Sequence, residues 1–164
     1  MDRNINEVCG FLDRLQIGYE IFRHSPAFTL EECREIEKTT GAEICKNLLL
    51  RTTSGDKYFL LLVAGDKKFV TKDVSKKLGS SRLSFAPGEE MASILNTEPG
   101  SLSITSLIFD KEKKVKLAID RDVYDGEFIC CHPSNNRATL KIRTHDITEK
   151  LLTFLETEPI IIEI

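Results

Sequence analysis

Several stretches of the chain carry apolar residues at helical spacing and are bounded by residues that start or stop helices. Thr29 and Glu32 form the signature of a capping box, in which side chain and backbone satisfy each other's hydrogen bonds at a helix start. Thr71 is expected to cap the third helix, and Pro87 suits the first turn of the fourth. The helices are predicted over residues 3–16, 30–39, 72–78, 87–95 and 145–156.

Other stretches are alternating or continuously apolar over a few residues, as strands are. Two of them flank the turn Thr53-Ser54-Gly55-Asp56, which predicts a β-hairpin with a buried second arm. Because several neighbouring strands are joined by turns too short for parallel crossovers, we expect an α/β fold: a single domain, residues 1–164, with a central mixed, largely antiparallel sheet packed against helices. The strands are predicted over residues 19–23, 44–51, 58–64, 82–85, 102–109, 115–120, 127–131 and 138–142.

Composition places the chain among ordinary globular proteins. Of its 164 residues, 41% are hydrophobic and 30% are charged. The start is charged, and no later apolar run approaches the ~20 residues that span a bilayer, so we expect a cytoplasmic protein without a membrane partner. The five cysteines include no Cys-x-x-Cys pair, which predicts reduced thiols and neither a disulfide framework nor a zinc ribbon.

The chain lacks the common catalytic signatures, such as the nucleophile elbow, the phosphate loop and the zinc-protease helix, and no metal site is expected from its His and Cys spacing. Lys46 and Asn47 open an apolar strand instead. By alternation Lys46 shares a face with Leu48 and Leu50, so its ammonium group stands at the edge of an apolar face, where it can hold a carbonyl or a phosphate. On position alone, the alternative is a lysine that reaches from the strand end into water.

Two further polar segments are candidates for chemistry. Backbone N–H groups of the turn around Gly100 can face a ligand oxygen, although most Pro-Gly turns are only turns. His132 follows Cys131 at the end of a strand, and because successive strand residues face opposite ways, the two are not expected to form a nucleophile and base. His132 either orients a substrate or water, or is a structural residue at the edge of a turn.

The net charge of −3 argues against indiscriminate binding to nucleic acid, and DNA is not expected as a partner. Lysines nonetheless gather at one strand-to-helix junction, where they either contact phosphates or form a solvated face. We interpret a second lysine run, residues 111–116, as a solvated hairpin. The junction cluster consists of Lys67, Lys68, Lys72, Lys76 and Lys77.

Four segments, taken in order, resemble the YbaK/EbsC-like aminoacyl-tRNA editing family, which includes the editing insertion domain of bacterial prolyl-tRNA synthetases and its free-standing relatives. The resemblance covers nearly the whole chain. Each motif alone is modestly specific, but four in the right order and spacing are a much stronger signal. The motifs are His24-x-Pro26-x-x-Thr29, Lys46-Asn47-Leu48, Gly100-Ser101-Leu102-Ser103 and His132-Pro133-Ser134-Asn135.

The resemblance implies a compact α/β fold with a central mixed sheet. It also implies an enzyme that hydrolyses the ester between a wrong amino acid and the terminal adenosine of a tRNA. It implies no metal, cofactor or protein nucleophile, because a hydroxyl of the terminal ribose helps to activate water. Three residues would be catalytic: Lys46 would anchor the substrate beside the ester, amides around Gly100 would receive the carbonyl oxygen, and His132 would line the amino-acid pocket or position water. The implied substrate-binding residues are Phe28, Leu30, Asn47, Leu48, Ser101, Leu102, Ser103, Ile104 and Pro133.

The resemblance also implies the partners. The lysine cluster Lys67–Lys77 would bind the acceptor end of tRNA(Pro), and prolyl-tRNA synthetase is the natural protein partner. The chain is most similar to the branch whose usual substrate is alanine on tRNA(Pro). Prolyl-tRNA synthetase makes this product by mistake, because each methylene group missing from a substrate changes the binding free energy by only ~1–3 kcal/mol. The loop Pro99–Ser103 does not match the Gly-Gly-x-Ser-Pro loop of the cysteine-specific branch, and Ile104 replaces a proline that many relatives have. The alternatives are deacylation of Cys-tRNA(Pro) or another small aminoacyl-tRNA, and a non-catalytic tRNA-binding module.

Overall fold

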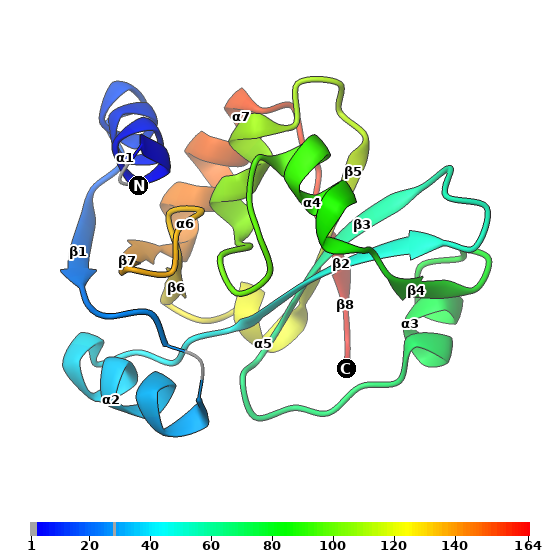
Figure 1. The fold of residues 1–164 in the computed structure, drawn as a ribbon, viewed down its shortest axis with the longest axis horizontal. Coiled ribbons are helices and arrows are strands. Elements are labelled where there is room, and N and C mark those ends of the chain that lie inside the picture. Colours follow the sequence, from blue (N-terminus) through cyan, green and yellow to red (C-terminus); the bar gives the residue numbers. More distant parts are fainter. Residues whose placement is uncertain (1–2, 28) are drawn as a thin grey trace.

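The strands of the described chain, residues 3–27 and 29–164, form two sheets in the computed structural model (Figure 1). The smaller sheet is antiparallel, with β7 (Ala138–Arg143) between β1 (Tyr19–Arg23) and β6 (Phe128–Cys131). An isolated parallel bridge between Ile44 and Cys130 joins β6 to the segment that leads into the larger sheet. That sheet has the order β4 (Leu83–Phe85), β2 (Lys46–Thr52), β3 (Tyr58–Val63), β5 (Val115–Asp120) and β8 (Ile160–Ile162).

Within the larger sheet, β2 pairs antiparallel with both β3 and β4, whereas β5 pairs parallel with both β3 and β8. The predicted hairpin of β2 and β3 is therefore confirmed, as is the α/β fold with a mixed sheet. The strands divide between two sheets because β1, β6 and β7 pair only with one another among the named strands.

The helices begin and end where local hydrogen bonds allow. The predicted capping box is present: the Thr29 hydroxyl accepts from the Glu32 backbone N–H, and the Glu32 carboxylate accepts from the Thr29 N–H. Gly41 closes the same helix in the left-handed conformation, with φ +70°. The helices are α1 (Arg3–Arg14), α2 (Leu30–Thr40), α3 (Thr71–Lys77), α4 (Gly88–Leu95), α5 (Arg121–Tyr124), α6 (Thr144–Asp146) and α7 (Leu152–Phe154), with a 3₁₀ helix over Ile104–Phe109 and a π-helical turn over Ile147–Leu151 between α6 and α7.

Two local predictions are wrong. Residues 102–109 are not a strand, because Ser103 caps the 3₁₀ helix: its hydroxyl accepts from the Thr105 N–H, and its own N–H donates to the Ser106 hydroxyl. Such side-chain bonds offer the backbone an alternative to a sheet ladder. Thr71 does not cap α3 but is its first residue, and the capping position is held by Val70 without a side-chain bond.

The larger sheet carries apolar side chains on both faces. Leu49, Leu60 and Leu62 lie in the main core with side chains from α1, α4 and the last helical segment. Their neighbours Leu50 and Leu61 lie in a second cluster on the opposite face, with Val74 of α3. Burial on both faces explains why β3 is a continuous apolar run. None of the described helices combines the length and apolar character that crossing a bilayer requires.

A buried carboxylate at the end of β5 holds the loop that follows β3. Asp120 is fully buried, and its oxygens accept hydrogen bonds from the Ala64 N–H at 3.2 Å and from Lys67 Nζ at 2.9 Å. Lys67 Nζ also lies 2.8 Å from the exposed carboxylate of Asp122, and these two partners, Asp122 first, raise the pKa of Lys67. The Lys67 carbonyl in turn accepts from Lys46 Nζ at 2.6 Å. Asp120 thereby positions the predicted catalytic residue Lys46 indirectly, through Lys67.

We predict that Asp120→Ala lowers the free energy of unfolding by about 3 kcal/mol, because it leaves the partly buried donors of Ala64 and Lys67 without their acceptor. Asp122→Ala is the matched control: its side chain is 67% exposed, and it should cost less than about 1 kcal/mol. Urea denaturation of the two variants and the wild type measures both values. Equal losses would contradict the central place given to Asp120.

Candidate functional site

His132 lies at the end of β6, in a partly buried position. Its Nδ1 is 2.8 Å from the Ala138 carbonyl. Because a carbonyl only accepts, Nδ1 carries the proton, which leaves Nε2 of the neutral ring as an acceptor. Burial lowers the pKa of His132; the bond to Ala138 opposes this effect, and the nearby His24 adds to it. At neutral pH the ring can therefore accept a hydrogen bond from a substrate ammonium group or from water.

The backbone of His132 holds residues 99–105, which we call the glycine loop, against the end of β6. Its carbonyl accepts from Thr105 Oγ1 at 2.9 Å and also from the Ser103 hydroxyl. One turn further on, Ser106 Oγ is 2.7 Å from Ser134 Oγ. The third and fourth sequence motifs, 29 or more residues apart in the chain, are thus joined by hydroxyl groups.

Gly100 has φ +88°, a left-handed conformation that favours glycine, and the turn closes with a 3.0 Å bond from the Ser101 N–H to the Glu98 carbonyl. A side chain at Gly100 would come within 4.0 Å of the Asn136 amide. The glycine loop therefore lies against the segment that follows His132, and its backbone can approach a ligand closely.

The first motif meets the fourth. The His24 and His132 rings have centroids 6.1 Å apart, and the His24 N–H donates to the Arg137 carbonyl. His24 Nε2 is 2.8 Å from Thr139 Oγ1, and Nδ1 is 2.8 Å from the Ser25 carbonyl. Sequence reasoning placed His24 in a motif without giving it a role. Its position beside His132 is set by the pairing of β1 with β7, which no local pattern reveals.

Lys46 begins β2 and is partly buried. Among the described residues its one hydrogen-bond acceptor is the Lys67 carbonyl, so two ammonium protons remain for a ligand. The parallel bridge from Ile44 to Cys130 relates it to His132: both chains run in the same direction, and each of the two residues lies two positions beyond the bridge. The second motif therefore starts beside the strand end that carries the fourth.

The predicted substrate-binding residues differ in exposure. Leu48 is partly buried against the second apolar cluster, and Asn47 donates to the Cys45 carbonyl at 3.1 Å, whereas its buried Oδ1 has no partner in the described chain. Leu102 and Ile104 are packed in the main core. The remaining buried members of the set are Ser101, Ser103 and Pro133.

Two of the predicted substrate-binding side chains cannot be placed. Phe28 and the side chain of Leu30 lie outside the described residues. What the described chain brings together is therefore His24, the Gly100 loop and His132, with Lys46 approaching from the strand beside them. The roles assigned to these groups stay predictions.

The lysine cluster is divided. Lys67 is held by Asp120 and Asp122, and Lys77 Nζ donates to the Glu163 carbonyl. Lys68, Lys72 and Lys76 are exposed. Among the described residues these three have neither an ion-pair nor a hydrogen-bond partner, so any contact with phosphates would fall mainly to them.

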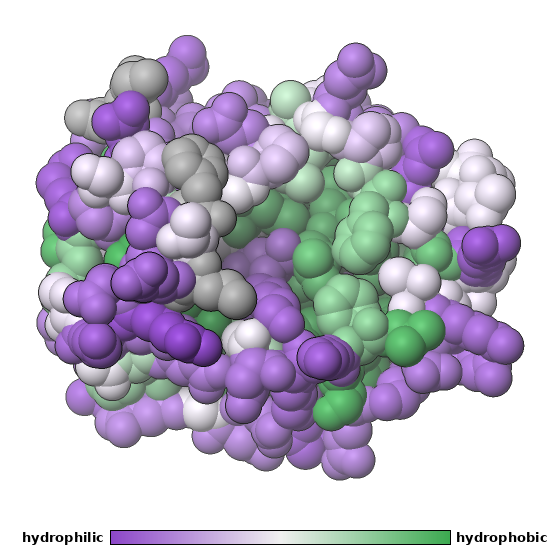
Figure 2. Space-filling view, turned by 60° about the horizontal axis from the view of Figure 1, so that its bottom comes forward, coloured by the Kyte–Doolittle hydropathy of each residue, from purple (hydrophilic) through white to green (hydrophobic). Residues whose placement is uncertain are grey.

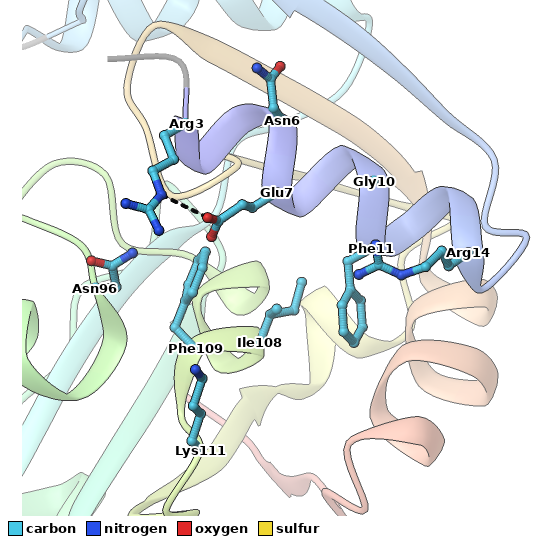
Figure 3. Close-up of a pocket in the computed structure, with 10 residues that line it drawn as sticks. All are labelled: Arg3, Asn6, Glu7, Gly10, Phe11, Arg14, Asn96, Ile108, Phe109 and Lys111. Carbon is cyan, nitrogen blue, oxygen red and sulfur yellow. Dashed lines mark hydrogen bonds and ion pairs between the residues drawn. The ribbon is translucent and has the colours of Figure 1, made fainter.

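A hollow of about 730 Å³ lies between α1 and the 3₁₀ helix (Figure 3). Phe11, Ile108 and Phe109 line it together with Arg3, which is paired with Glu7 one turn along α1. None of the predicted catalytic residues lines this hollow. Figure 2 shows another face of the molecule, with a hollow beside an area of apolar side chains on the side that holds β4 and α3 in Figure 1.

The described residues offer no group of three or more His, Cys, Asp or Glu side chains that could hold a metal ion. Burial raises the pKa of the Cys45 thiol to about 12, and burial likewise raises the pKa of Cys131. Neither is suited to act as a thiolate nucleophile at neutral pH. The chemistry available is that of an ammonium group, backbone N–H donors and a neutral imidazole.

Residues 24–150 match the family described as aminoacyl-tRNA editing domain. The chain is 30% identical over 141 residues to the prolyl-tRNA editing protein ProX of Acetoanaerobium sticklandii, a match that covers 86% of this chain and 85% of that protein. It is 31% identical over 148 residues to the prolyl-tRNA synthetase associated domain-containing protein 1 of Danio rerio, covering 89% of this chain and 78% of that one.

A solved structure of a candidate trans-editing enzyme for prolyl tRNA synthetase has the same fold, with a TM-score of 0.75 at 17% identity over 100% of this chain and 99% of that chain. The family match spans all four motifs, and it includes both segments that meet at His132. The chain therefore belongs to the aminoacyl-tRNA editing domain family, as its motifs predict.

Proposed function

We propose that the protein hydrolyses the ester of tRNA(Pro) mischarged with alanine and spares Pro-tRNA(Pro). Membership of the editing family and the prolyl-tRNA names of its relatives support this reaction class. The observation that carries the proposal is the junction of the glycine loop with His132, beside the strand that begins at Lys46. The loop sequence favours alanine over cysteine, since it lacks the second glycine and the proline of the cysteine-specific branch.

In the proposed reaction, Lys46 holds the aminoacyl-adenosine end with the two ammonium protons that the Lys67 carbonyl leaves free. Backbone N–H groups around Gly100 donate to the ester carbonyl oxygen as negative charge develops on it, apart from those of Ser101 and Ser103, which donate within the segment. These donors are fixed before substrate arrives, because Ser103 and Thr105 hold the loop to the His132 carbonyl. Preorganised donors of this kind stabilise a transition state without reorganising during the reaction.

Water then adds to the ester carbonyl carbon, while a hydroxyl of the terminal ribose accepts its proton and relays it to the departing ribose oxygen. The carbon–oxygen bond to the ribose breaks, and the products are free alanine and an intact tRNA. The scheme needs no metal ion, cofactor or covalent protein intermediate. His132, with Nε2 as an acceptor, would bind the amino group of the substrate or orient the water.

We propose that the tRNA is selected through its acceptor end, with prolyl-tRNA synthetase as the partner that delivers it. The reaction belongs in the cytoplasm, where aminoacyl-tRNAs are used. Exclusion of proline would be steric, with Leu48 and Phe28 as proposed walls of the amino-acid pocket.

We predict that the purified protein hydrolyses Ala-tRNA(Pro) faster than Cys-tRNA(Pro) and leaves Pro-tRNA(Pro) intact, at the same rate with and without a chelator. Release of labelled amino acid from the three substrates measures this. Chelator-sensitive activity restored by zinc would contradict the mechanism, and faster release of cysteine would contradict the specificity. An inert wild type that still binds tRNA would favour the non-catalytic module.

Lys46→Ala should lower the rate of deacylation by about two to three orders of magnitude, the usual scale for losing one preorganised electrostatic group. Lys46→Arg should rescue little, because a planar guanidinium cannot replace a compact ammonium group. His132→Ala should cause a smaller loss. Lys116→Ala, at an exposed position of β5, is the control and should leave turnover unchanged. Circular dichroism should show a native fold in each variant, and a folded Lys46→Ala protein with normal turnover would refute the site.

Charge reversal at Lys72 and Lys76 should raise KM for aminoacyl-tRNA more than it lowers kcat, because these exposed side chains would contact phosphates and not the ester. The effect should shrink as salt rises. Reversal at Lys111 and Lys116, two exposed lysines of the other run, is the matched control. If both double variants behave alike at physiological salt, the acceptor stem docks elsewhere.

A further inference from the structure

Two aromatic rings form an exposed apolar surface at the edge of the larger sheet. Phe85 of β4 is 59% exposed, and its ring is edge-on to that of Phe69, with centroids 6.4 Å apart. Val70, next to Phe69, is also 59% exposed. We call these three residues the aromatic patch. Single exposed apolar residues are ordinary, but a contiguous patch marks a surface that binds something.

The aromatic patch lies on the same face of the sheet as the predicted catalytic lysine. Phe85 is paired with Leu50, and Leu50 shares its face of β2 with Leu48 and Lys46. Four residues of strand separate Lys46 from Leu50, roughly 13 Å at 3.3 Å per residue. A second route also joins them: the Lys67 carbonyl that accepts from Lys46 is two residues before Phe69. A chain whose end sits at Lys46 can thus pass over Leu48 to the patch.

The chain segment that carries Phe69 and Val70 is positive in a protein that is negative overall. Residues 66–82 contain six Lys or Arg residues against two Asp, whereas the whole chain has a net charge of −3. Lys68 precedes Phe69, and with Phe69, Val70 and Lys77 it lines a hollow of about 200 Å³. The acidic groups on this segment are Asp66 and Asp73. Even without Lys67, which Asp120 and Asp122 neutralise, the basic residues remain in excess.

Aromatic side chains set among cations are the combination that binds single-stranded nucleic acid: bases stack on the rings and phosphates meet the lysines. We propose that the aromatic patch is a stacking platform for the unpaired nucleotides that precede the terminal adenosine of the tRNA, with Lys68 and Lys72 beside their phosphates. The proposal rests on the proposed function and extends it to a second subsite, which holds bases rather than the amino acid or the ester.

The test measures binding of the full-length protein to a fluorescent single-stranded RNA ending in C-C-A, and to the same RNA lacking the two cytosine bases. Phe85→Ala should weaken binding of the intact RNA about tenfold, the scale of one lost base–aromatic stack. Phe85→Leu keeps an apolar side chain but no ring, and should lose as much. Removing the cytosines should weaken wild-type binding by a similar factor and should hardly affect Phe85→Ala, because the two changes remove the same contact.

Phe154→Ala is the matched control. Phe154 is 60% exposed and is likewise edge-on to another ring, that of Phe11, but it lies on α7, away from β4 and α3 (Figure 1). Its loss should leave RNA affinity unchanged. In deacylation assays, Phe85→Ala should raise KM about tenfold and change kcat little.

Failure of this proposal and failure of the proposed function give different results. If the wild type deacylates Ala-tRNA(Pro) but Phe85→Ala binds both RNAs as the wild type does, the platform is refuted and the function stands. If the wild type shows no deacylation, yet the effects of Phe85→Ala and of removing the cytosines on RNA binding are not additive, the platform is supported and the proposed function is refuted. A dimer that dissociates in Phe85→Ala, seen by sedimentation without coupling to the bases, would show a protein interface and would overturn the proposal.

Discussion

The arrangement of the candidate site depends on one buried carboxylate. Asp120 is removed from water at the end of β5, so its charge is stable only while donors surround it. Those donors come from the segment after β3, and fixing that segment fixes the carbonyl that receives Lys46. A carboxylate at the end of β5 thereby determines where the ammonium group at the start of β2 stands. Neither strand alone could hold a flexible lysine side chain in one place.

The second constraint is the joining of distant motifs by hydroxyl groups. Ser103, Thr105 and Ser106 are buried in a segment that is otherwise apolar, and each bonds to the turn after β6 or to its own loop. Burying hydroxyls costs free energy unless partners are supplied, and here the partners are supplied by the opposite motif. The site therefore forms only when both motifs are in place, which couples its geometry to the completed fold.

Much of the fold could be predicted from local patterns. The capping box at Thr29, the hairpin of β2 and β3, and the bounds of β5 follow from capping chemistry and periodicity, which act over a few residues. The same reasoning fails for residues 102–109, where apolar content resembles a strand but serines supply competing local bonds. It also misses β8, because three residues are too few to show a period and their parallel pairing with β5 is a long-range contact.

The candidate site could be predicted only as a set of segments. The motifs name Lys46, Gly100 and His132, but the neutral tautomer of His132 depends on the Ala138 carbonyl, and the position of Lys46 depends on Asp120, a residue in no motif. The two hydrogen bonds that the His132 carbonyl accepts have a further consequence. Two hydroxyls donate to one acceptor, so the loss of either the Ser103 or the Thr105 hydroxyl leaves one hydrogen bond between the loop and the His132 carbonyl. Redundancy of this kind means that one of the two hydroxyl side chains can change while the loop stays joined to the turn after β6.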